Sequence, residues 1–350
     1  MSGKLPTKPK LIVDLSKSSK LNGYIVIYND NLGPALGGTR IADYNSEKDA
    51  LTDALKLAEA MTYKSAIAGL PFGGGKGVII NKPGTPRGEV LKEYASQVNK
   101  LKGEFYTGED VGLEEPDVQF MLKFSPYFIG KTGEAGDPSY FAALSAFNSI
   151  KVSLNFIYKS DKIEGRTFAI KGVGKTGNFL AKLLSHAGGR IFVIDPDPKR
   201  VMHLMATTKN VYEAKGNIEE MDVDVFCPCA MGNDITKSNV NKIKAKIVAG
   251  TANNQLESRE IGDELFKRGI LKVPDYVANA GGLLDVADEL MPGGYNRKRV
   301  LNGIDGLKDK LLRIFKLSKK EKISPSRVAD AFAEKVFLKK KETQNVAHKR

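Results

Sequence analysis

The segment that most restricts the fold is "RTFAIKGVGKTGNFLAKLLSHAGGRIFVIDPD", residues 166–197. A β-rich run at Thr167–Lys171 leads into the pattern Gly-x-Gly-x-x-Gly, and an apolar helical pattern follows it. A second β-rich run ends at Asp195. This order predicts a βαβ unit, and further strand patterns at "VDVFCPCA" and "AKIVAGTANNQ" extend it into an α/β fold with a doubly wound Rossmann sheet.

The glycine turn within this segment predicts a dinucleotide site. Gly172 permits the tight turn, Gly174 admits a pyrophosphate, and Gly177 lets the helix and the strand pack closely. The N-terminus of the helix faces the anion, where its backbone N–H groups and its dipole favour negative charge. Because the strand before and the helix after are both present, the pattern indicates cofactor binding rather than an ordinary turn.

The cofactor that suits this turn is NAD rather than NADP. Asp195 can accept hydrogen bonds from the adenine-side ribose hydroxyls, and its charge repels a 2′-phosphate. Lys199 and Arg200 follow closely and leave NADP open as an alternative. The predicted cofactor-binding residues are Gly172, Val173, Gly174, Lys175, Thr176, Gly177, Asn178, Asp195, Cys229 and Ala230.

The chain before this segment mixes helix and strand. "NSEKDALTDALKLAEAMTYK" carries a Ser-x-x-Asp capping signature from Ser46 to Asp49 and an apolar helical repeat. It predicts an amphipathic helix that ends near Lys64. The β-rich stretch "GYIVIYND" precedes this helix, and after it a glycine loop, "GLPFGGGK", runs into the strand candidate "GVII".

Length and composition favour more than one domain. The chain has 350 residues, of which 41% are hydrophobic, and this is enough for two cores. A stretch rich in Gly, Asp and Pro, "GKTGEAGDPSY", marks the change of pattern at residues 130–140. We expect a mixed α/β substrate-binding and catalytic domain over residues 1–135, a Rossmann NAD-binding domain over 136–285, and a C-terminal helical segment with a basic tail over 286–350.

Several classes of protein are disfavoured by the sequence. No apolar run approaches the ~20 residues that span a bilayer, and "MSGKLPTKPK" lacks the apolar core of a secretion signal, so we expect a cytoplasmic protein without a membrane partner. Cys227 and Cys229 are too close for the usual zinc or redox spacing, and the three histidines lie far apart, so no metal is predicted. The net charge of +13 is spread along the chain except at residues 339–350, which favours a solvated basic surface over nucleic-acid binding.

Seven ordered blocks lie between about Leu32 and Asn296: "LGPALGGTR", "MTYKSAIAGLPFGGGK", "TGEDVG", "KGVGKTG", "CPCAMG", "ANNQL" and "PDYVANAGGLLDVADEL". Together they resemble the amino-acid dehydrogenases that act on glutamate, leucine, phenylalanine and valine, most closely the leucine and phenylalanine branch. The resemblance implies a homo-oligomer whose C-terminal helices fold back over the first domain. It also implies the reaction: hydride leaves Cα of an L-amino acid, and the iminium is hydrolysed to a 2-oxo acid and ammonium.

The lysine after the glycine run, Lys76, does not fit a phosphate-binding loop, because glycine follows it where such a loop needs Ser or Thr. Hydrolysis of an iminium needs a base near neutral pH, and a lysine serves only when a like charge or desolvation lowers its pKa from about 10.4. The resemblance implies that Lys76 is this base, that Lys64 binds the substrate α-carboxylate, and that Asp110 passes protons to and from the amino nitrogen. It also implies that Gly37 and Asn254 hold the carboxylate or the amino group.

The expected substrate is an apolar amino acid. Leu36 and Val286 lie at positions that resemble the lysine and the serine with which glutamate dehydrogenases bind the side-chain carboxylate, and an apolar residue cannot neutralise a buried charge. Gly108 and Leu283 resemble phenylalanine dehydrogenase, whereas leucine- and valine-type enzymes usually have alanine and valine there. The pair favours a phenylalanine-like or large aliphatic substrate, with leucine or valine as the alternative.

Two departures from the family pattern keep other classes of function open. Relatives usually carry threonine where this chain has Ala142 in the loop after "GDPS", and Tyr140 replaces a proline. A hydrogen bond to the nicotinamide amide is then missing, so a catalytically silent NAD-binding regulator is an alternative, as is a nucleic-acid binder with a dehydrogenase fold. The presence of Lys64, Lys76 and Asp110 favours an enzyme.

Overall fold

The chain divides into two compact units. The computed structural model describes residues 8–16, 21–82, 84–130 and 137–339. The first unit contains the described residues of 1–135, Val286–Asn296 and those from Phe332 onward, and the second contains those of 136–285 and 297–331. The basic tail after Lys339 and most of the predicted connector lie outside the described residues.

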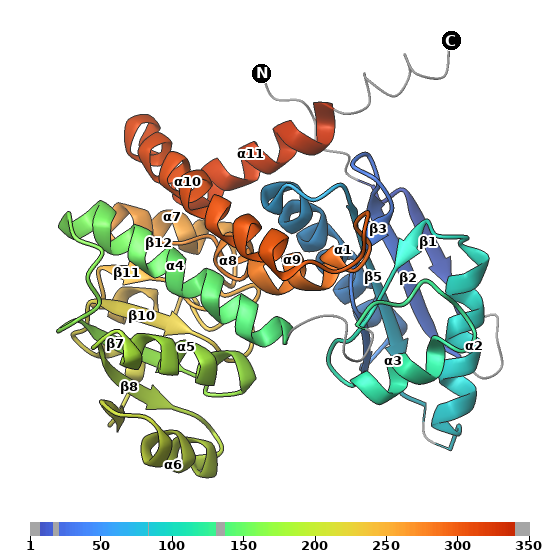
Figure 1. Cartoon of the computed structure of the whole chain (residues 1–350), viewed down its shortest axis with the longest axis horizontal. Helices are drawn as coiled ribbons and strands as arrows, with labels where there is room; N and C mark the ends of the chain where they lie inside the picture. Colours follow the sequence, from blue (N-terminus) through green and yellow to red (C-terminus); the bar gives the residue numbers. More distant parts are fainter. Residues whose placement is uncertain (1–7, 17–20, 83, 131–136, 340–350) are drawn as a thin grey trace. The chain divides into compact units, whose positions relative to one another are not determined.

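The first unit is built on a six-stranded sheet (Figure 1). Its strands are β1 (Leu11–Asp14), β2 (Gly23–Asn29), β3 (Ala35–Leu36), β4 (Thr39–Ala42), β5 (Gly73–Ile80) and β6 (Phe105–Tyr106), and its helices include α1 (Glu47–Ala68), α2 (Arg87–Lys100) and α3 (Glu115–Met121). The strand order is β1-β2-β5-β3-β6, and β4 pairs with β5 off this path. β2 runs antiparallel to β1 and β5, whereas β3 and β4 run parallel to β5.

Alternating side chains along β2 explain why helices cover both faces of this sheet. Val26 packs with Ala54 of α1 in one core cluster, whereas Ile25 packs with Tyr94 of α2 in another. Because successive residues of a strand point to opposite faces, α1 covers one face and α2 with α3 covers the other. The mixed α/β first domain that the sequence predicts is confirmed.

The predicted amphipathic helix is α1, and it is longer than predicted. The hydroxyl of Ser46 accepts a hydrogen bond from the backbone N–H of Asp49 at 3.1 Å, which confirms the capping signature. The helix continues past Lys64 to Ala68. It ends there because Gly69 adopts a left-handed conformation with φ 80° and turns the chain away.

The glycine run that we expected in a loop is part of strand β5. A Cβ atom at Gly74 would overlap the backbone of Thr62 on α1, and a Cβ atom at Gly77 would overlap the phenol oxygen of Tyr94 on α2. The helices therefore lie too close to β5 for any side chain at these positions. The loop prediction was wrong because glycine is rare in strands for reasons of propensity, and close packing overrides that preference here.

The second unit has a six-stranded sheet in which every pairing is parallel. Its strands are β7 (Thr167–Lys171), β8 (Arg190–Ile194), β9 (Val211–Glu213), β10 (Val225–Pro228), β11 (Ile247–Val248) and β12 (Leu271–Lys272). Their order, β12-β11-β10-β7-β8-β9, is that of a doubly wound sheet. The strand order reverses between β7 and β10, while all the strands stay parallel. The predicted Rossmann fold is confirmed, and the predicted first strand coincides with β7.

The helices of the second unit are α4 (Pro138–Tyr158), α5 (Lys175–His186), α6 (Pro198–Thr207), α7 (Arg259–Lys267), α8 (Asp275–Ala278), most of α9 (Ala280–Asp288), α10 (Arg297–Glu321) and the first part of α11 (Pro325–Lys339), with short 3₁₀ turns at Ile218–Glu220 and Val240–Lys242. Tyr140 and Ala142, which we expected in a loop, lie near the start of α4. The helix starts that early because Asp137 caps it and Pro138 suits the first helical position.

Two C-terminal stretches, Val286–Asn296 and the described residues from Phe332 onward, return to the first unit, whereas Arg297–Ala331 belongs to the second. The carboxylate of Glu289 accepts a hydrogen bond from the backbone N–H of Gly130 at 3.0 Å. In α11, Glu334 accepts a hydrogen bond from the hydroxyl of Tyr63 at 3.0 Å, and the ring of Phe337 packs edge-on against Tyr63 with 5.4 Å between centroids. Within the described ranges, every helix is too short or too polar to cross a membrane.

Candidate functional site

Lys76 lies in the middle of β5, on the face of the sheet that α1 covers. Its side chain is only 4% exposed, and its ammonium group contacts the carboxylate of Asp110. Its backbone is paired with Val26 of β2, so the strand fixes its position. An ammonium group in so dry a place needs a counter-charge, because an unpaired buried charge is strongly destabilising. Asp110 supplies it, and two residues that we expected to be catalytic are in direct contact.

Asp110 belongs to a short segment that runs beside β4. The backbone N–H of Thr39 donates to the carbonyl of Gly108 at 2.9 Å, and that of Ile41 donates to the carbonyl of Val111 at 2.9 Å. The N–H of Val111 donates in turn to Oδ1 of Asp110 at 2.6 Å. These bonds fix the carboxylate relative to the sheet that carries Lys76.

Two cations set the charge of Asp110. Nε of Arg40 on β4 lies 3.5 Å from Oδ1, while the ammonium group of Lys76 contacts Oδ2. Burial alone would raise the pKa of Asp110, but the charges of Lys76 and Arg40 outweigh burial and lower the pKa below its ordinary value. Asp110 is therefore ionised at neutral pH. Arg40 is not among the site residues predicted from the sequence, although it stands in the block "LGPALGGTR".

A buried polar cluster lies at the start of the Asp110 segment. Oγ1 of Thr39 is 2.6 Å from the hydroxyl of Tyr94 and 2.7 Å from Oγ1 of Thr107. Burial raises the pKa of Tyr94, so its hydroxyl stays protonated and can donate. Since Thr107 lies three residues before Asp110, this cluster joins the start of the segment to β4 and α2.

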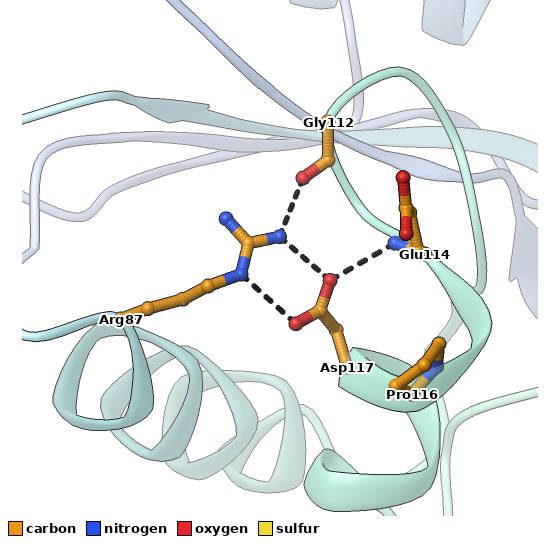
Figure 2. A pocket seen from close by; sticks show the side chains of 5 residues that line it. All are labelled: Arg87, Gly112, Glu114, Pro116 and Asp117. Carbon is orange, nitrogen blue, oxygen red and sulfur yellow. Dashed lines mark hydrogen bonds and ion pairs between the residues drawn. The ribbon is translucent and has the colours of Figure 1, made fainter.

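Arg87 of α2 holds the other end of the segment, as Figure 2 shows. Its guanidinium group donates to the carbonyl of Gly112 at 2.7 Å and to the carboxylate of Asp117 at 2.9 and 2.6 Å. The hydrogen bond from Arg87 is the main cause of the lowered pKa of Asp117. These residues, with Glu114 and Pro116, line a surface cavity of about 360 Å³ that contains none of the predicted site residues. Its polar groups anchor α3 and the end of the Asp110 segment.

The residues predicted to bind the substrate in the first unit lie around β5. Leu36 on β3 is fully buried and its strand pairs with both β5 and β6. A Cβ atom at Gly37 would stand 3.3 Å from Cγ of Met61 on α1. Met61 and Lys64 are three residues apart and so share one face of α1. The predicted carboxylate anchor therefore lies on the helix face that is directed toward Gly37.

The space that a side chain at Gly108 would occupy is already taken by Ile129. A Cβ atom there would stand 2.8 Å from the carbonyl oxygen of Ile129 and 3.0 Å from its Cγ1. Protein interiors are close-packed, so a missing methyl group is usually filled by a neighbour. Here Ile129 is that neighbour, so Ile129 has to be considered together with Gly108 as a residue that limits substrate size.

We expect Gly108→Ala to destabilise the protein by about 1–3 kcal/mol, because the added methyl group must displace Ile129. Ile129→Ala removes Cγ1, the side-chain atom that the added methyl group would meet, and should restore part of this loss in the double variant. Thermal unfolding of both single variants and the double variant tests this, since an effect shared by two touching residues is not additive. Strict additivity of the two single changes would show that the methyl group does not meet Ile129.

In the second unit, Gly172 and Ala230 lie at the ends of the neighbouring strands β7 and β10. Gly172 has φ 95°, and a Cβ atom there would stand 2.7 Å from the backbone nitrogen of Ala230. The N–H of Cys229 donates to the carbonyl of Lys171 at 2.8 Å and joins the two strand ends. The strand order of the sheet reverses at this point, and doubly wound sheets bind their ligands where the strand order reverses.

The start of α5 is suited to an anion. Gly174 is its N-cap, and the nearest atom to a Cβ there is Nη1 of Arg200 at 3.8 Å, so this side of the turn is open. The first N–H groups of a helix lack acceptors within the helix and attract phosphates. The residues present fit the pyrophosphate of a dinucleotide. The other predicted residues of this first turn are Lys175, Thr176, Gly177 and Asn178.

Asp195 follows β8 directly, and its side chain is 5% exposed. Its two oxygens accept hydrogen bonds from the backbone N–H groups of Val173 at 2.8 Å and Asp197 at 2.9 Å. Nη1 of Arg200 lies 3.9 Å from the same carboxylate. Asp195 thus joins the glycine turn to the end of β8, a structural role that sequence analysis missed.

The remaining predicted substrate residues lie on a loop and on α9. Asn254 is exposed and adopts φ 49°, a left-handed conformation that asparagine tolerates. Leu283 and Val286 are three residues apart and so share one face of α9. Asn279, which sequence analysis did not select, donates its amide N–H to Oδ1 of Asn253 at 2.8 Å and so supports the loop that carries Asn254.

The cysteines show no sign of activation. Both are free, and burial raises the pKa of Cys229 to about 11 and that of Cys227 well above its ordinary value. A raised pKa disfavours the thiolate, which is the reactive form. In the described part of the chain, no group of three or more His, Cys, Asp or Glu residues could hold a metal ion.

Comparison with known proteins identifies two matching family models. Residues 9–126 match "Glu/Leu/Phe/Val dehydrogenase, dimerisation domain", and residues 194–291 match "Glutamate/Leucine/Phenylalanine/Valine dehydrogenase". Leucine dehydrogenase of Thermoactinomyces intermedius is 36% identical over 93% of this chain and 89% of its own, and phenylalanine dehydrogenase of Caldalkalibacillus thermarum is 37% identical over 91% and 88%. The crystal structure of L-tryptophan dehydrogenase from Nostoc punctiforme superposes with a TM-score of 0.83 at 34% identity, covering 95% of this chain and 97% of the other.

Proposed function

Because the chain belongs to the Glu/Leu/Phe/Val dehydrogenase family, it is an oxidoreductase that deaminates an apolar amino acid, and we propose that it does so with NAD and prefers a large side chain. The balanced reaction converts the L-amino acid, NAD⁺ and water into the 2-oxo acid, ammonium, NADH and a proton. The bound cofactor supplies the hydride acceptor. The residues of the chain have to bind and orient the amino acid, activate the water and move the protons.

The observation that carries this proposal is the buried contact between Lys76 and Asp110. In the proposed reaction Lys76 takes the proton of the water that attacks the iminium carbon, and Asp110 exchanges protons with the amino nitrogen. General acid–base catalysis needs both groups within hydrogen-bond reach of the reacting atoms. Because Lys76 and Asp110 touch, both can reach the same bound substrate. Lys64 completes the proposal as the cation that binds the α-carboxylate.

An apolar substrate is consistent with the neighbourhood of this pair. Leu36 is fully buried on β3, next to the strand that carries Lys76. A γ-carboxylate placed there would lose its hydration without gaining a counter-charge. Leu283 and Val286 on α9 are the further apolar residues proposed to contact the substrate, and we propose a phenylalanine-like substrate with leucine or valine as the alternative.

Turnover with a panel of amino acids tests the proposed function. Purified protein, NAD⁺ and single L-amino acids at alkaline pH should produce NADH, which is followed by its absorbance. We expect phenylalanine, tryptophan or leucine to give the highest kcat/KM and glutamate to be a poor substrate. No turnover with any amino acid, together with intact NAD binding, would favour a catalytically silent NAD-binding regulator.

We propose NAD rather than NADP because of Asp195. Asp195→Ser should weaken NAD binding by ~10- to 100-fold, since hydrogen bonds to a charged acceptor are among the stronger ones. It should also relieve the repulsion of a 2′-phosphate. Asp195→Asn is the matched variant, because it removes the charge but keeps an oxygen that can accept the N–H of Val173 or Asp197.

Equilibrium binding of both cofactors to these variants separates the two effects. Asp195→Asn should gain affinity for NADP while losing less affinity for NAD than Asp195→Ser does. Asp222→Ser, at an exposed position of the same unit, is the control and should leave both affinities unchanged. An unchanged preference in both Asp195 variants would mean that the ribose is bound by other residues, such as Lys199 or Arg200.

We also propose a homo-oligomer. The family model that matches residues 9–126 is described as a dimerisation domain, and homo-oligomers with closed symmetry are common among soluble enzymes. Light scattering of the purified protein tests this, and the mass of a single chain at micromolar concentration would contradict it.

A further inference from the structure

We propose that Arg40 is a positioning residue for Asp110: it keeps the carboxylate directed at Lys76 and ionised until the carboxylate accepts a proton from the amino nitrogen of the substrate. The inference rests on the proposed function, since Asp110 exchanges protons with the amino nitrogen, and Lys76 with water, only if the protein is the dehydrogenase proposed above. It adds Arg40, together with Asp53 and Tyr44 that hold Arg40, to the residues of the proposed site.

The geometry gives each oxygen of Asp110 its own donors. Oδ2 contacts the ammonium group of Lys76, whereas Oδ1 faces Nε of Arg40 at 3.5 Å and accepts the N–H of Val111 at 2.6 Å. Rotation of the carboxylate would exchange these partners and break the bond with Val111. Arg40 and Val111 together therefore keep Oδ2 directed at Lys76.

Arg40 is itself held in place. Its Nη1 donates to Oδ2 of Asp53 on α1 at 2.9 Å, and the hydroxyl of Tyr44 donates to the same oxygen at 2.7 Å. Burial raises the pKa of Tyr44, and the hydrogen bond to Asp53 raises it further, so the phenol remains a donor over the working pH range. The chain of contacts from Tyr44 through Asp53 and Arg40 to Asp110 is continuous.

The charges explain why a second cation is needed. Burial would lower the pKa of Arg40, but the carboxylates of Asp110 and Asp53 raise it, so Arg40 carries its charge at every relevant pH. Lys76 has to be neutral when it accepts a proton, and at that moment it cannot balance the charge of Asp110. Arg40 remains charged through that step and keeps Asp110 anionic. The groups that act on Asp110 are thus Lys76 from β5 and Arg40 from β4, with Asp53 and Tyr44 behind Arg40.

The sign of the pH effect follows from these charges. The pKa of Asp110 is held below its ordinary value although burial opposes this, and Arg40 is one of the two cations responsible. Replacing Arg40 by glutamine removes that cation, so the pKa of Asp110 should rise. The acid limb of the profile of kcat/KM against pH, which reports groups of the free enzyme, should move to higher pH.

The experiment compares four variants with the wild type by the profile of kcat/KM against pH, by NAD affinity and by thermal unfolding. Arg40→Gln should lose ~10- to 100-fold in kcat/KM at neutral pH and show the displaced acid limb. Arg40→Lys keeps a charge near Asp110 and should bring the limb back toward its wild-type position. Asp53→Asn retains Arg40 but loosens it, and should lie between these two. Arg327→Gln, which breaks an exposed pair with Asp263 in the second unit, is the control and should leave the profile unchanged.

The outcomes separate this inference from the proposed function. If the wild type is active and Arg40→Gln loses activity equally at every pH, or loses only thermal stability, Arg40 is merely structural and the inference is wrong. If Arg40→Gln does not fold, the profiles of Arg40→Lys and Asp53→Asn decide in the same way. If the wild type deaminates no amino acid, the proposed function fails, and titration of the Asp110 carboxyl by ¹³C NMR decides the inference instead. An apparent pKa that rises in the variants supports it, and an unchanged one overturns it.

Discussion

Lys76→Ala should lower kcat by ~10³-fold while leaving NAD affinity unchanged, since general acid–base groups typically contribute 10²- to 10⁴-fold. Lys76 is buried on β5 and touches Asp110, so its removal takes away the proposed base and the nearest counter-charge of Asp110 together. NAD affinity is expected to stay the same because the proposed cofactor residues belong to the second unit, whereas Lys76 belongs to the first. Stopped-flow or steady-state production of NADH and equilibrium binding of NAD measure the two effects separately.

Two controls distinguish the loss of a catalytic group from the loss of the folded state. Removing one partner of a buried ion pair also destabilises a protein, so thermal unfolding has to show that Lys76→Ala remains folded at the assay temperature. Arg40 stays beside Asp110 in this variant and limits the cost. Lys56→Ala, at an exposed position of α1, is the matched control and should retain wild-type kcat. A folded Lys76→Ala variant with near-wild-type kcat would exclude Lys76 as the base.

The second unit was predictable because its signal is local. The strand, the turn at Gly172, the helix and Asp195 all lie within residues 166–197, so the order of elements can be read from one short segment. The turn also needs its particular residue, because Gly172 adopts φ 95° and has Ala230 beside it. What the sequence did not indicate is that Asp195 also holds this turn through Val173, since that contact becomes apparent only when the two strands are placed side by side.

The surroundings of the proposed catalytic residues were predicted less completely. Lys76 and Asp110 were found through the family resemblance, and no spacing in the sequence indicates that they touch. Arg40 was missed because its position depends on strand pairing: it lies opposite Val78, two residues after Lys76, and therefore on the same face of the sheet. β4 has only four residues and pairs with β5 off the main strand path, so its register cannot be read from the sequence. The same holds for Ile129, whose contact with Gly108 changes the argument about substrate size.

The glycine run illustrates how a tertiary contact can determine a residue type. Gly74 looks like a loop residue, whereas Gly77 begins the predicted strand, and nothing near either of them in the sequence requires the absence of a side chain. Their neighbours, Thr62 on α1 and Tyr94 on α2, come from helices that precede and follow the strand. Helix–strand contacts as close as these cannot be predicted from strand propensity, because propensity favours Val and Ile in a buried strand.

Gly74→Ala should therefore be among the most damaging single substitutions in the first unit. Its methyl group would overlap the backbone nitrogen and the hydroxyl of Thr62, and a backbone atom cannot move aside as a flexible side chain can. We expect a loss of ~3 kcal/mol or more, at or above the upper end for overpacked cores, and a fall in Tm of roughly 6–12 °C. Activity should fall as well, because α1 carries Lys64 and Asp53 and would be displaced from β5.

Gly88→Ala is the matched control for this substitution. Gly88 lies in the first turn of α2 in the same unit, and the nearest atom to its Cβ position is Cζ of Phe120 at 3.8 Å, an ordinary contact distance. Alanine there gains about 0.5–1 kcal/mol from helix propensity, so Tm should stay the same or rise slightly. Thermal unfolding followed by circular dichroism, together with kcat/KM, compares the two variants. If Gly74→Ala unfolds at the same temperature as Gly88→Ala, the contact between α1 and β5 is looser than described, and the reason given for the glycine run is wrong.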